Sequence, residues 1–320
     1  MGATHIGDIL YNTASLRFLA ERLPECKWYY FVTPPASQVL ANNPFLAGCI
    51  DSLDALDSLD VAICYNSGGY WRELLEISRR GLANRVAYVH KGFSGLVTHE
   101  ISINFPQLFP AYFRDLVSQL TGLTPTWSLR PEVFTIDRDV ERAQSLWEEL
   151  ELDGTRPVLA CFATSRQSLG VWPSKNFGAA IRQVEGARDI QTVLLGAPED
   201  LSVLTDLKNA FGLRARVAAG KLELLELVAF LRRCTSVFST DSGPRHLANA
   251  AGVQVTYIRN ISFSHVEAGR YCETELDLAP QVEFVPAAKQ AEVFSALDPV
   301  EIGNRVTAAV RDSWERNLAS

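Results

Sequence analysis

The sequence predicts an α/β protein built from two Rossmann-like, doubly wound domains with parallel sheets. Three observations support this fold class: the length of the chain, the alternation of apolar strands with helices, and a strand that runs into a loop suited to phosphate. At 320 residues the chain exceeds the usual size of a single domain. Strands separated by helices of about ten to fifteen residues form parallel sheets through right-handed crossovers.

The first series of elements lies in the N-terminal half of the chain. Its strands are short apolar and aromatic runs, expected at residues 27–32, 61–65 and 85–89. Helical patterns cover residues 9–23, 36–42 and 70–80. A buried strand normally precedes a loop such as Gly7-Asp8, yet only six residues come before it. Either the first domain lacks its first strand or the sequence starts late, and both alternatives stay open.

A second series starts at residue 157 and repeats the same alternation. Its strands are expected at residues 158–162 and 192–195, directly before Asp241, and at residues 253–258. Its helices are expected at residues 173–184, 200–211, 222–234 and 244–251. We therefore predict two domains, residues 1–152 and residues 153–298, that face each other across a cleft. The last helix, within residues 299–320, is expected to pack back on the first domain because no strand follows it.

The loop after the third strand of this second series carries the clearest chemical signal. It reads Asp-Ser-Gly-Pro-Arg-His-Leu-Ala over residues 241–248. Gly243 lets a ligand approach the backbone, and Pro244 opens a helix where its missing N–H costs nothing. The neighbouring N–H groups and the positive end of the helix dipole then suit a phosphate. The alternative is an ordinary turn in which Asp241 or Ser242 caps the helix.

Composition and charge exclude several classes of protein. The formal net charge of −7 argues against nucleic acid as a partner, because binding its backbone needs clustered Lys and Arg. No apolar run approaches the roughly 20 residues that span a bilayer, and the N-terminus lacks a signal-peptide pattern. Six scattered cysteines form no CxxC pair and no zinc spacing. We expect a cytoplasmic protein with at most peripheral membrane contact.

Five short motifs occur in an informative order along the chain. They are His-Ile-Gly-Asp-Ile-Leu at residues 5–10, Trp-Pro at residues 172–173 with Phe177, Leu-Gly-Ala-Pro-Glu-Asp at residues 195–200, Ala-Gly-Lys-Leu at residues 219–222 with Leu225, and the loop at residues 241–248. In this order the motifs resemble those of glycosyltransferase family 9, which includes the heptosyltransferases of lipopolysaccharide core assembly. The last motif is fairly specific, whereas Gly-Asp alone is weak.

The resemblance implies a GT-B fold, in which the first domain binds the acceptor and the second binds a nucleotide sugar. It implies an inverting glycosyltransferase that needs neither a metal nor a further cofactor. The sugar would be a heptose or another hexose-like unit carried on a nucleotide diphosphate. An ADP-sugar is the first expected donor, and a saccharide or glycoconjugate is the expected acceptor.

The resemblance also assigns roles to residues. Asp8 would be the base that deprotonates the acceptor hydroxyl, although taken alone it would more often cap a helix. Donor contacts are expected from Thr164, Ser165, Arg166, Gly196, Asp241, Ser242, Gly243, Pro244, Arg245 and His246. Asp241 is expected to meet a sugar hydroxyl or a supporting backbone N–H, because it would repel a phosphate. His246 would either orient a diphosphate oxygen or pack locally. The weaker acceptor candidates are His5, Asn66, Gly68 and His90.

Three features depart from the family pattern. The lysine that usually precedes Trp-Pro is absent, and Arg166 is the nearby cation that could replace it, although the two side chains are not equivalent donors. Arg245 occupies a position that is often apolar, where it would supply the missing charge or point to solvent. Residues 259–267 lack the family's usual turn near the donor base and sugar. These departures leave the identity of the donor open.

Two rival interpretations also stay open. One is a GT-B module that binds a nucleotide sugar without turnover, which the absent strand and absent lysine favour. The other is a sugar-nucleotide epimerase, for which the chain shows no recognisable pattern. Each differs from a transferase in a measurable way, because only a transferase moves the sugar to an acceptor.

A possible metal motif occurs between the two series. Asp137 and Asp139 match the Asp-x-Asp pattern with which other glycosyltransferases hold a divalent ion. A helix is expected to follow at once, and acidic residues in a first helical turn complement the helix dipole. We therefore expect these two residues to serve the helix, and we expect no metal site.

Overall fold

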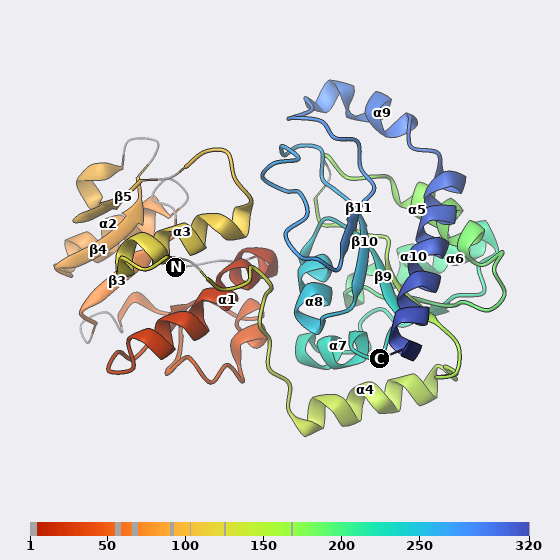
Figure 1. Ribbon diagram of the computed structural model, residues 1–320, viewed down its shortest axis with the longest axis horizontal. Coiled ribbons are helices and arrows are strands. Elements are labelled where there is room, and N and C mark those ends of the chain that lie inside the picture. The colour runs from red at the N-terminus through yellow and green to blue at the C-terminus, as the bar shows by residue number, and fades with distance from the viewer. Residues whose placement is uncertain are drawn as a thin grey trace. The chain divides into compact units, whose positions relative to one another are not determined.

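The computed structural model describes residues 5–54, 59–65, 70–89, 93–102, 104–124, 126–167 and 169–319. Contacts divide the chain into two compact units, one that ends at Phe134 and one that starts at Thr135. Each unit combines helices with parallel strands (Figure 1), which confirms the predicted α/β class. None of the helices in the described ranges combines the length and the apolar character that a membrane span requires.

The boundary between the units lies earlier than the predicted boundary at residues 152–153. Helix α4 (Asp137–Glu149), placed above in the first domain, belongs to unit 2 because it packs on α7 (Leu224–Leu231). The ring centroids of Trp147 and Phe230 lie 5.6 Å apart in this contact. The sequence could not predict which unit α4 belongs to, because the apolar stripe of a helix indicates that one face is buried but not which surface it packs against.

Unit 1 holds two small parallel sheets. Strands β1 (Tyr29–Phe31) and β2 (Gly48–Ile50) form one of them, and β3 (Val61–Cys64), β4 (Asn84–Tyr88) and β5 (His99–Ile101) form the other. Its described helices are α1 (Ile6–Arg22), α2 (Trp71–Arg79) and α3 (Phe109–Thr121), with short 3-10 turns η1 (Ala36–Leu40) and η3 (Ser94–Leu96). Helix α1 packs against α3, and Phe18 stacks on Trp127 at a centroid distance of 3.8 Å.

Unit 2 is built on one parallel sheet with the strand order β11-β10-β9-β6-β7-β8. The strands are β6 (Val158–Phe162), β7 (Gln191–Leu194), β8 (Arg216–Val217), β9 (Ser236–Thr240), β10 (Gln254–Ile258) and β11 (Glu275–Asp277). The remaining elements are α5 (Ser174–Val184), η4 (Pro198–Asp200), α6 (Leu201–Phe211), α8 (Gly243–Ala251), α9 (Ala287–Ser295) and α10 (Pro299–Ala319). Because β6 and β9 are buried throughout, helices must cover both faces of this sheet.

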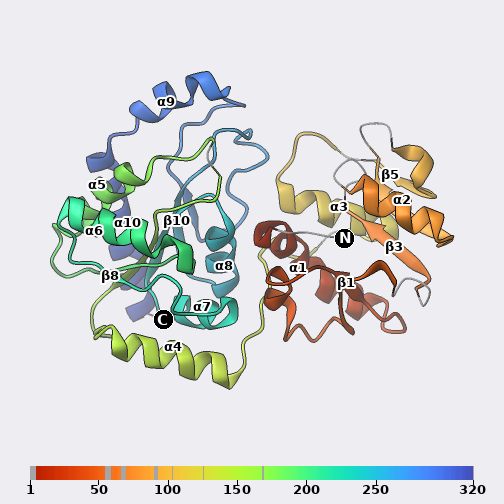
Figure 2. The ribbon, with the colours of Figure 1, turned by 180° about the vertical axis from the view of Figure 1, so that it is seen from behind.

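Helices cover the two faces of this sheet. Figures 1 and 2 show α5 and α10 on one side of the strands and α7 and α8 on the other. Helix α10 packs against α5, β9 and β10 through Ile302, Val306 and Val310. The expectation that this last helix packs back on the first domain is therefore wrong. Its apolar stripe completes the core of unit 2, in which Trp172 and Phe177 also lie.

The sheets of the two units differ in how their strands are joined. In unit 2 the first strand, β6, lies at the centre between β9 and β7. In the described part of unit 1, which begins at His5, no strand precedes α1, and no strand joins β3 to β1. The strands β1–β2 and β3–β4–β5 form separate sheets.

Candidate functional site

The carboxyl ends of the strands of unit 2 meet at one edge of its sheet. From β6 the chain proceeds outward through β7 to β8, and it then returns to build β9 on the other side of β6. This reversal makes the boundary between β6 and β9 a topological switch point, where open α/β sheets bind ligands. The loops that carry the predicted donor residues leave β6, β7 and β9 at this edge.

The end of β9 and the loop that follows it are hydrogen-bonded to the segment after β6. The Oγ1 atom of Thr240 donates to the carbonyl oxygen of Thr164 at 3.2 Å and lies 2.8 Å from the Oγ atom of Ser242. Ser242 is the extended N-cap of α8, with φ −156° and ψ −178°, and Gly243 starts the helix. Within the described chain, no hydrogen bond engages the N–H groups of Ser242 and Gly243. Two donors at a helix N-terminus therefore remain for a ligand, as phosphate binding requires.

Asp241 holds the neighbouring loop in place. Its side chain is 7% exposed, and its Oδ2 atom accepts a hydrogen bond from the backbone N–H of Asn260 at 3.2 Å. Its Oδ1 atom accepts from Nη1 of Arg245 at 2.8 Å. Of the two partners expected from the sequence, a sugar hydroxyl or a supporting N–H, the fold supplies the N–H. The carboxylate therefore links the loop after β9 to the loop after β10.

Arg245 has a different role from the predicted contact with the donor diphosphate. Its side chain is 1% exposed, so it neither faces a ligand nor points to solvent. Besides Asp241, its donors reach Oε1 of Glu275 at 2.5 Å and the carbonyl oxygens of Ala268 at 3.0 Å and Gly269 at 2.7 Å. Its guanidinium also covers the ring of Tyr257 at 3.7 Å. The positive charge of Arg245 is compensated by the carboxylates of Asp241 and Glu275. Without such partners, a buried guanidinium would cost several kcal/mol.

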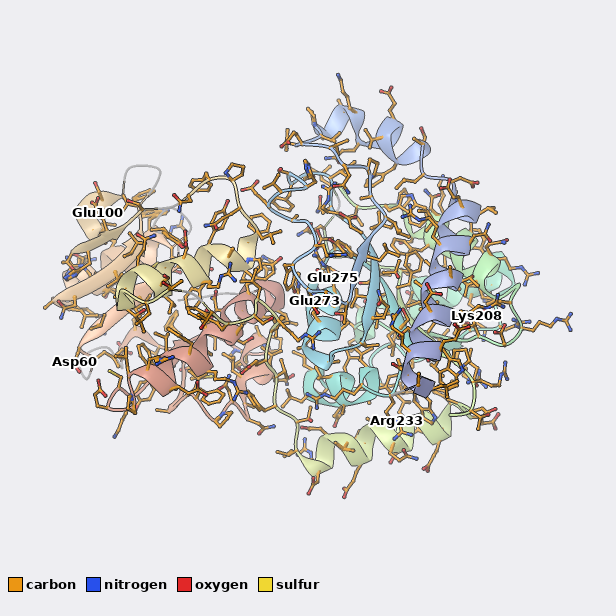
Figure 3. All side chains as sticks on the ribbon, in the orientation of Figure 1. Asp60, Glu100, Lys208, Arg233, Glu273 and Glu275 are labelled. Atoms are coloured by element: carbon orange, nitrogen blue, oxygen red, sulfur yellow. The ribbon has the colours of Figure 1, made fainter. Side chains whose placement is uncertain are left out.

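Glu275 is the second buried carboxylate that pairs with Arg245. It comes from β11 and lies against α8 (Figure 3). Its Oε1 atom also accepts from Nδ2 of Asn249 at 2.8 Å, and its Oε2 atom accepts from the N–H groups of Tyr271 at 2.8 Å and Cys272 at 3.1 Å. Burial acts to raise the pKa of Glu275, but the charge and hydrogen bonds of Arg245 bring it below the ordinary value. The residue is therefore ionised and fixes residues 268–275 beside the helix.

His246 packs locally rather than facing a ligand. It is 3% exposed, and its Nδ1 atom lies 2.6 Å from the hydroxyl of Tyr271. Burial lowers the pKa of His246 well below its ordinary value, and the charge of Arg245 lowers it further. The imidazole is therefore neutral. Of the two alternatives expected from the sequence, the structure favours local packing over contact with a diphosphate.

Arg166 is an exposed cation in the loop after β6. Its side chain is 84% exposed and pairs with Oε1 of Glu199 at 2.7 Å. Glu199 belongs to η4, which follows Gly196 after β7. A Cβ atom on Gly196 would lie 2.7 Å from Oδ2 of Asp200, so this turn requires glycine. An exposed ion pair of this kind is weak, which leaves Arg166 able to exchange Glu199 for a phosphate.

The loop before Trp172 is tied to the loop after β10. The backbone N–H of Gly170 donates to Oε1 of Gln290 at 2.7 Å, and the Gly170 carbonyl accepts from the N–H of Ile261 at 3.0 Å. The side chain of Asn260 donates to the Leu169 carbonyl at 3.3 Å. These bonds order the segment before Trp172 through its backbone N–H and carbonyl groups.

Replacing Gly170 with alanine tests this close approach. Gly170 has φ +71°, and a Cβ atom there would lie 1.8 Å from Oδ1 of Asn260 and 2.3 Å from Oγ of Ser262. The backbone strain costs about 1 kcal/mol, and displacing the two side chains adds about 1–3 kcal/mol. Gly212→Ala is the matched control, because Gly212 has φ +57° with nothing within 4 Å. Chemical denaturation should show a clearly larger loss for Gly170→Ala, and equal losses would contradict the contact.

Unit 1 contributes Asp8, which lies in the first turn of α1 with its side chain partly buried. Burial raises the pKa of Asp8 above its ordinary value, while the nearby His5 acts to lower it. A carboxylate whose pKa is raised by a partly apolar setting is a better proton acceptor than a fully hydrated one. The position therefore suits a base, although the same carboxylate also complements the dipole of α1.

Aromatic and polar side chains surround Asp8. Its negative charge raises the pKa values of Tyr30, Tyr65 and Tyr70, for each of which burial is the larger cause. One turn further along α1, Nδ2 of Asn12 donates to the Tyr30 hydroxyl at 2.7 Å. This bond ties the start of α1 to β1 and fixes the helix that carries Asp8.

The candidates for acceptor binding are only partly described. His5 is exposed and is the N-cap of α1, without a side-chain hydrogen bond to the helix. Asn66, Gly68 and His90 lie outside the described residues. Contact of these four residues with an acceptor therefore stays a prediction.

The Asp-x-Asp pair serves a helix, as expected. Asp137 and Asp139 lie in the first turn of α4, and Oδ2 of Asp139 accepts from the backbone N–H of Ile136 at 2.9 Å. Asp139 is 5% exposed. Elsewhere in the described ranges, no three of the His, Cys, Asp and Glu side chains gather as a metal site would require.

Several residues of this edge gave no signal in the sequence. Glu275, Tyr271, Asn260 and Gln290 position the loops, but each acts on a residue that lies many positions earlier in the chain. The unexpected arginine at position 245 was the available clue, because a charge beside an apolar helix face needs a buried partner. No spacing rule could have named that partner.

Comparison with solved structures identifies the class of fold. Over 97% of its length the chain matches 95% of a family 9 glycosyl transferase from Veillonella parvula, with a TM-score of 0.80 and 18% identity. It matches ADP-heptose lps heptosyltransferase II of E. coli over 97% of both chains, with a TM-score of 0.74 and 15% identity. E. coli heptosyltransferase WaaC with ADP matches over 97% of both chains, with a TM-score of 0.68 and 16% identity. The fold is therefore that of the GT-B glycosyltransferases.

The sequence places the chain within this class. Glycosyltransferase family 9 (heptosyltransferase) matches residues 76–257, which is more than half of the chain. No curated protein matches the sequence. The chain belongs to glycosyltransferase family 9, and it is a glycosyltransferase.

Proposed function

We propose that the protein transfers a heptose or another hexose-like sugar from a nucleotide diphosphate to a saccharide-type acceptor, with inversion at the anomeric carbon. In this reaction the acceptor oxygen forms a bond to the anomeric carbon as the bond from that carbon to the phosphate oxygen breaks. The nucleoside diphosphate leaves with the electron pair, and the acceptor proton passes to the base. The chemistry therefore requires a phosphate-binding group and a proton acceptor.

One observation carries the donor half of this proposal. The N–H groups of Ser242 and Gly243 are unengaged within the described chain and lie at the start of α8, at the switch point of the sheet of unit 2. Backbone donors fixed by the fold stabilise a departing diphosphate without rearranging during the reaction. Thr164, Ser165 and Arg166 lie in the loop after the neighbouring strand β6 and would also contact the donor. The WaaC structure named above contains ADP, which supports an ADP-sugar as the first donor to test.

Asp8 is the base in this proposal. Its raised pKa keeps it basic enough to take a proton from a hydroxyl as that oxygen attacks. The internally compensated charges of Arg245 and Asp241 hold the donor loop and take no part in proton transfer. We propose that the reaction proceeds without a metal, with the developing charge met by backbone N–H groups and Arg166. We also propose a cytoplasmic location, which suits the buried free thiols of Cys64, Cys161, Cys234 and Cys272.

Thermal unfolding against ADP, UDP, GDP, CDP and dTDP tests the donor site. A ligand at about 100 times its dissociation constant adds about 2.7 kcal/mol, which raises the unfolding midpoint by several degrees. We expect a selective shift with one diphosphate, first of all ADP. Gly243→Asp should abolish the shift, because a carboxylate at the start of α8 takes the N–H groups and repels phosphate. Gly243→Asn is the matched uncharged control and should keep most of it.

The outcome separates a transferase from a binding module. Transfer from the selected nucleotide sugar to an acceptor, followed by release of the diphosphate, supports the proposed reaction. Nucleotide binding without transfer or hydrolysis of any donor would favour a family member that has lost turnover. A full set of five diphosphates without any shift, in folded protein, would contradict the donor site itself.

A further inference from the structure

A cavity of about 180 Å³ lies in unit 2 at the edge opposite to the donor loops. Four arginines line it, Arg156, Arg188, Arg214 and Arg216, together with Ile190, Gln191 and Thr192. Strands β6, β7 and β8 begin at Val158, Gln191 and Arg216, so the cavity lies at their amino ends. Strands of four or five residues place this edge about 13–17 Å from the donor loops.

Backbone carbonyls hold three of the four guanidinium groups. Arg156 donates through Nη2 to the carbonyl oxygen of Arg188 at 2.7 Å and through Nε to that of Asp189 at 3.3 Å. Arg216 donates through Nη2 to the Glu151 carbonyl at 2.9 Å, and Arg214 donates to the Glu185 carbonyl. The side chains are therefore fixed before any ligand arrives, which lowers the entropic cost of binding.

The positive charge of this arginine cavity is only partly compensated. Among the ion pairs of the described residues, none includes a guanidinium of these four arginines. Three carboxylates lie nearby. Glu185 accepts from Thr192 and from the N–H of Arg214, and Asp153 accepts from Thr155 and lies within reach of the charge of Arg156. Asp189 pairs with Arg311, so four guanidinium groups face fewer than four available carboxylates. Two arginines also meet the C-terminal ends of α4 and α5, but each helix end carries only about half a negative charge. An excess of positive charge remains around the cavity.

We propose that the arginine cavity binds a phosphate group, at a site separate from the donor diphosphate. Guanidinium groups bind phosphate oxygens in pairs of parallel hydrogen bonds, and convergent arginines are typical of phosphate recognition. The cavity volume of about 180 Å³ is many times the roughly 10–15 Å³ that one water needs, so a phosphate ion can enter. The same chemistry is offered by free phosphate and by a phospholipid headgroup. The recessed position at a sheet edge favours a free phosphate or a small phosphorylated molecule.

Calorimetric titration of the full chain with inorganic phosphate tests the site. The Gly243→Asp variant serves as the background, because it blocks phosphate binding at the donor loop. On that background, Arg156→Gln and Arg188→Gln should each weaken binding about tenfold, since each removes a charge-assisted hydrogen-bond donor. Arg138→Gln removes an equal charge from the exposed first turn of α4 and should leave binding unchanged. All variants should retain the wild-type unfolding midpoint within a few degrees in phosphate-free buffer.

Vesicles distinguish the two sources of phosphate. Sedimentation with phosphatidylglycerol vesicles should show no binding that depends on Arg156 and Arg188. Vesicle binding that is lost in these variants, without saturable binding of free phosphate, would overturn the proposal in favour of a lipid headgroup. Equal phosphate affinity in the arginine variants and the background protein would also overturn it. The proposal does not rest on glycosyl transfer, so it can fail while the donor site is confirmed.

Discussion

Replacing Asp8 with asparagine is expected to lower the rate of glycosyl transfer by about 10²–10⁴-fold. Asparagine keeps the size of the side chain but cannot accept the acceptor proton. Donor binding should stay unchanged, because the donor loop belongs to unit 2 and Asp8 to unit 1. Steady-state transfer assays combined with nucleotide-induced thermal shifts measure both quantities. Asp51→Asn, at an exposed position of the same unit, is the matched control and should transfer at the wild-type rate.

The pH dependence provides a second readout for Asp8. Burial raises its pKa, and a base works only when deprotonated, so the wild-type rate should fall as pH drops through this raised value. An acid whose pKa is raised in the folded state destabilises that state when ionised, and this cost disappears as pH falls. Asp8→Asn removes the same cost, so its unfolding midpoint at neutral pH should equal or exceed that of the wild type. Unchanged transfer in Asp8→Asn would contradict the assignment of the base.

Replacing Arg245 with methionine is expected to lower the free energy of unfolding by about 3–5 kcal/mol. Methionine fills much of the volume but leaves Asp241 and Glu275 buried without their cation. The same change should weaken nucleotide binding, because Asp241 and residues 268–275 lose the group that fixes them beside α8. Chemical denaturation and nucleotide titration measure the two effects.

Two further variants identify the cause of that loss. The double variant Arg245→Met with Glu275→Gln should lose less stability than the sum of the single variants, because it removes both buried charges of one pair. Arg166→Met breaks an exposed ion pair, with side chains 84% and 58% exposed, and should cost at most about 1 kcal/mol. A loss in Arg245→Met as small as that in Arg166→Met would show that the buried network is not needed.

The sequence predicted the long, regular elements of the fold well. Apolar runs of strand length predicted β6, β7 and β10 within one residue, and β9 lies directly before Asp241 as expected. The edge strands β2, β5, β8 and β11 were missed, because two or three residues are too few to show a periodic pattern. Helices α3 and α9 were also missed.

The donor loop illustrates where prediction from the sequence stops. The order strand, glycine, proline and helix predicts a turn at Gly243 that binds phosphate. The structure shows the strand–turn–helix and puts it at the switch point, while phosphate binding stays a prediction. The same motif suggested a donor contact for Arg245 and left His246 either at the donor or packed locally, but both side chains are buried against Glu275 and Tyr271. A residue's type and position do not determine which way it faces on a helix, because the direction depends on what packs there.

The sequence by itself determined the α/β class, the presence of two units and the family, and it named Asp8 and the loop at residues 241–248 as candidates for the site. It could do so because these features depend on neighbouring residues, through hydrophobic periodicity, turn chemistry and a local motif. Only the tertiary structure decided that α4 and α10 belong to unit 2, that Asp241 supports Asn260, and that Arg245 pairs with Glu275. These outcomes depend on contacts between distant segments, where burial requires each charge and each apolar stripe to find a partner.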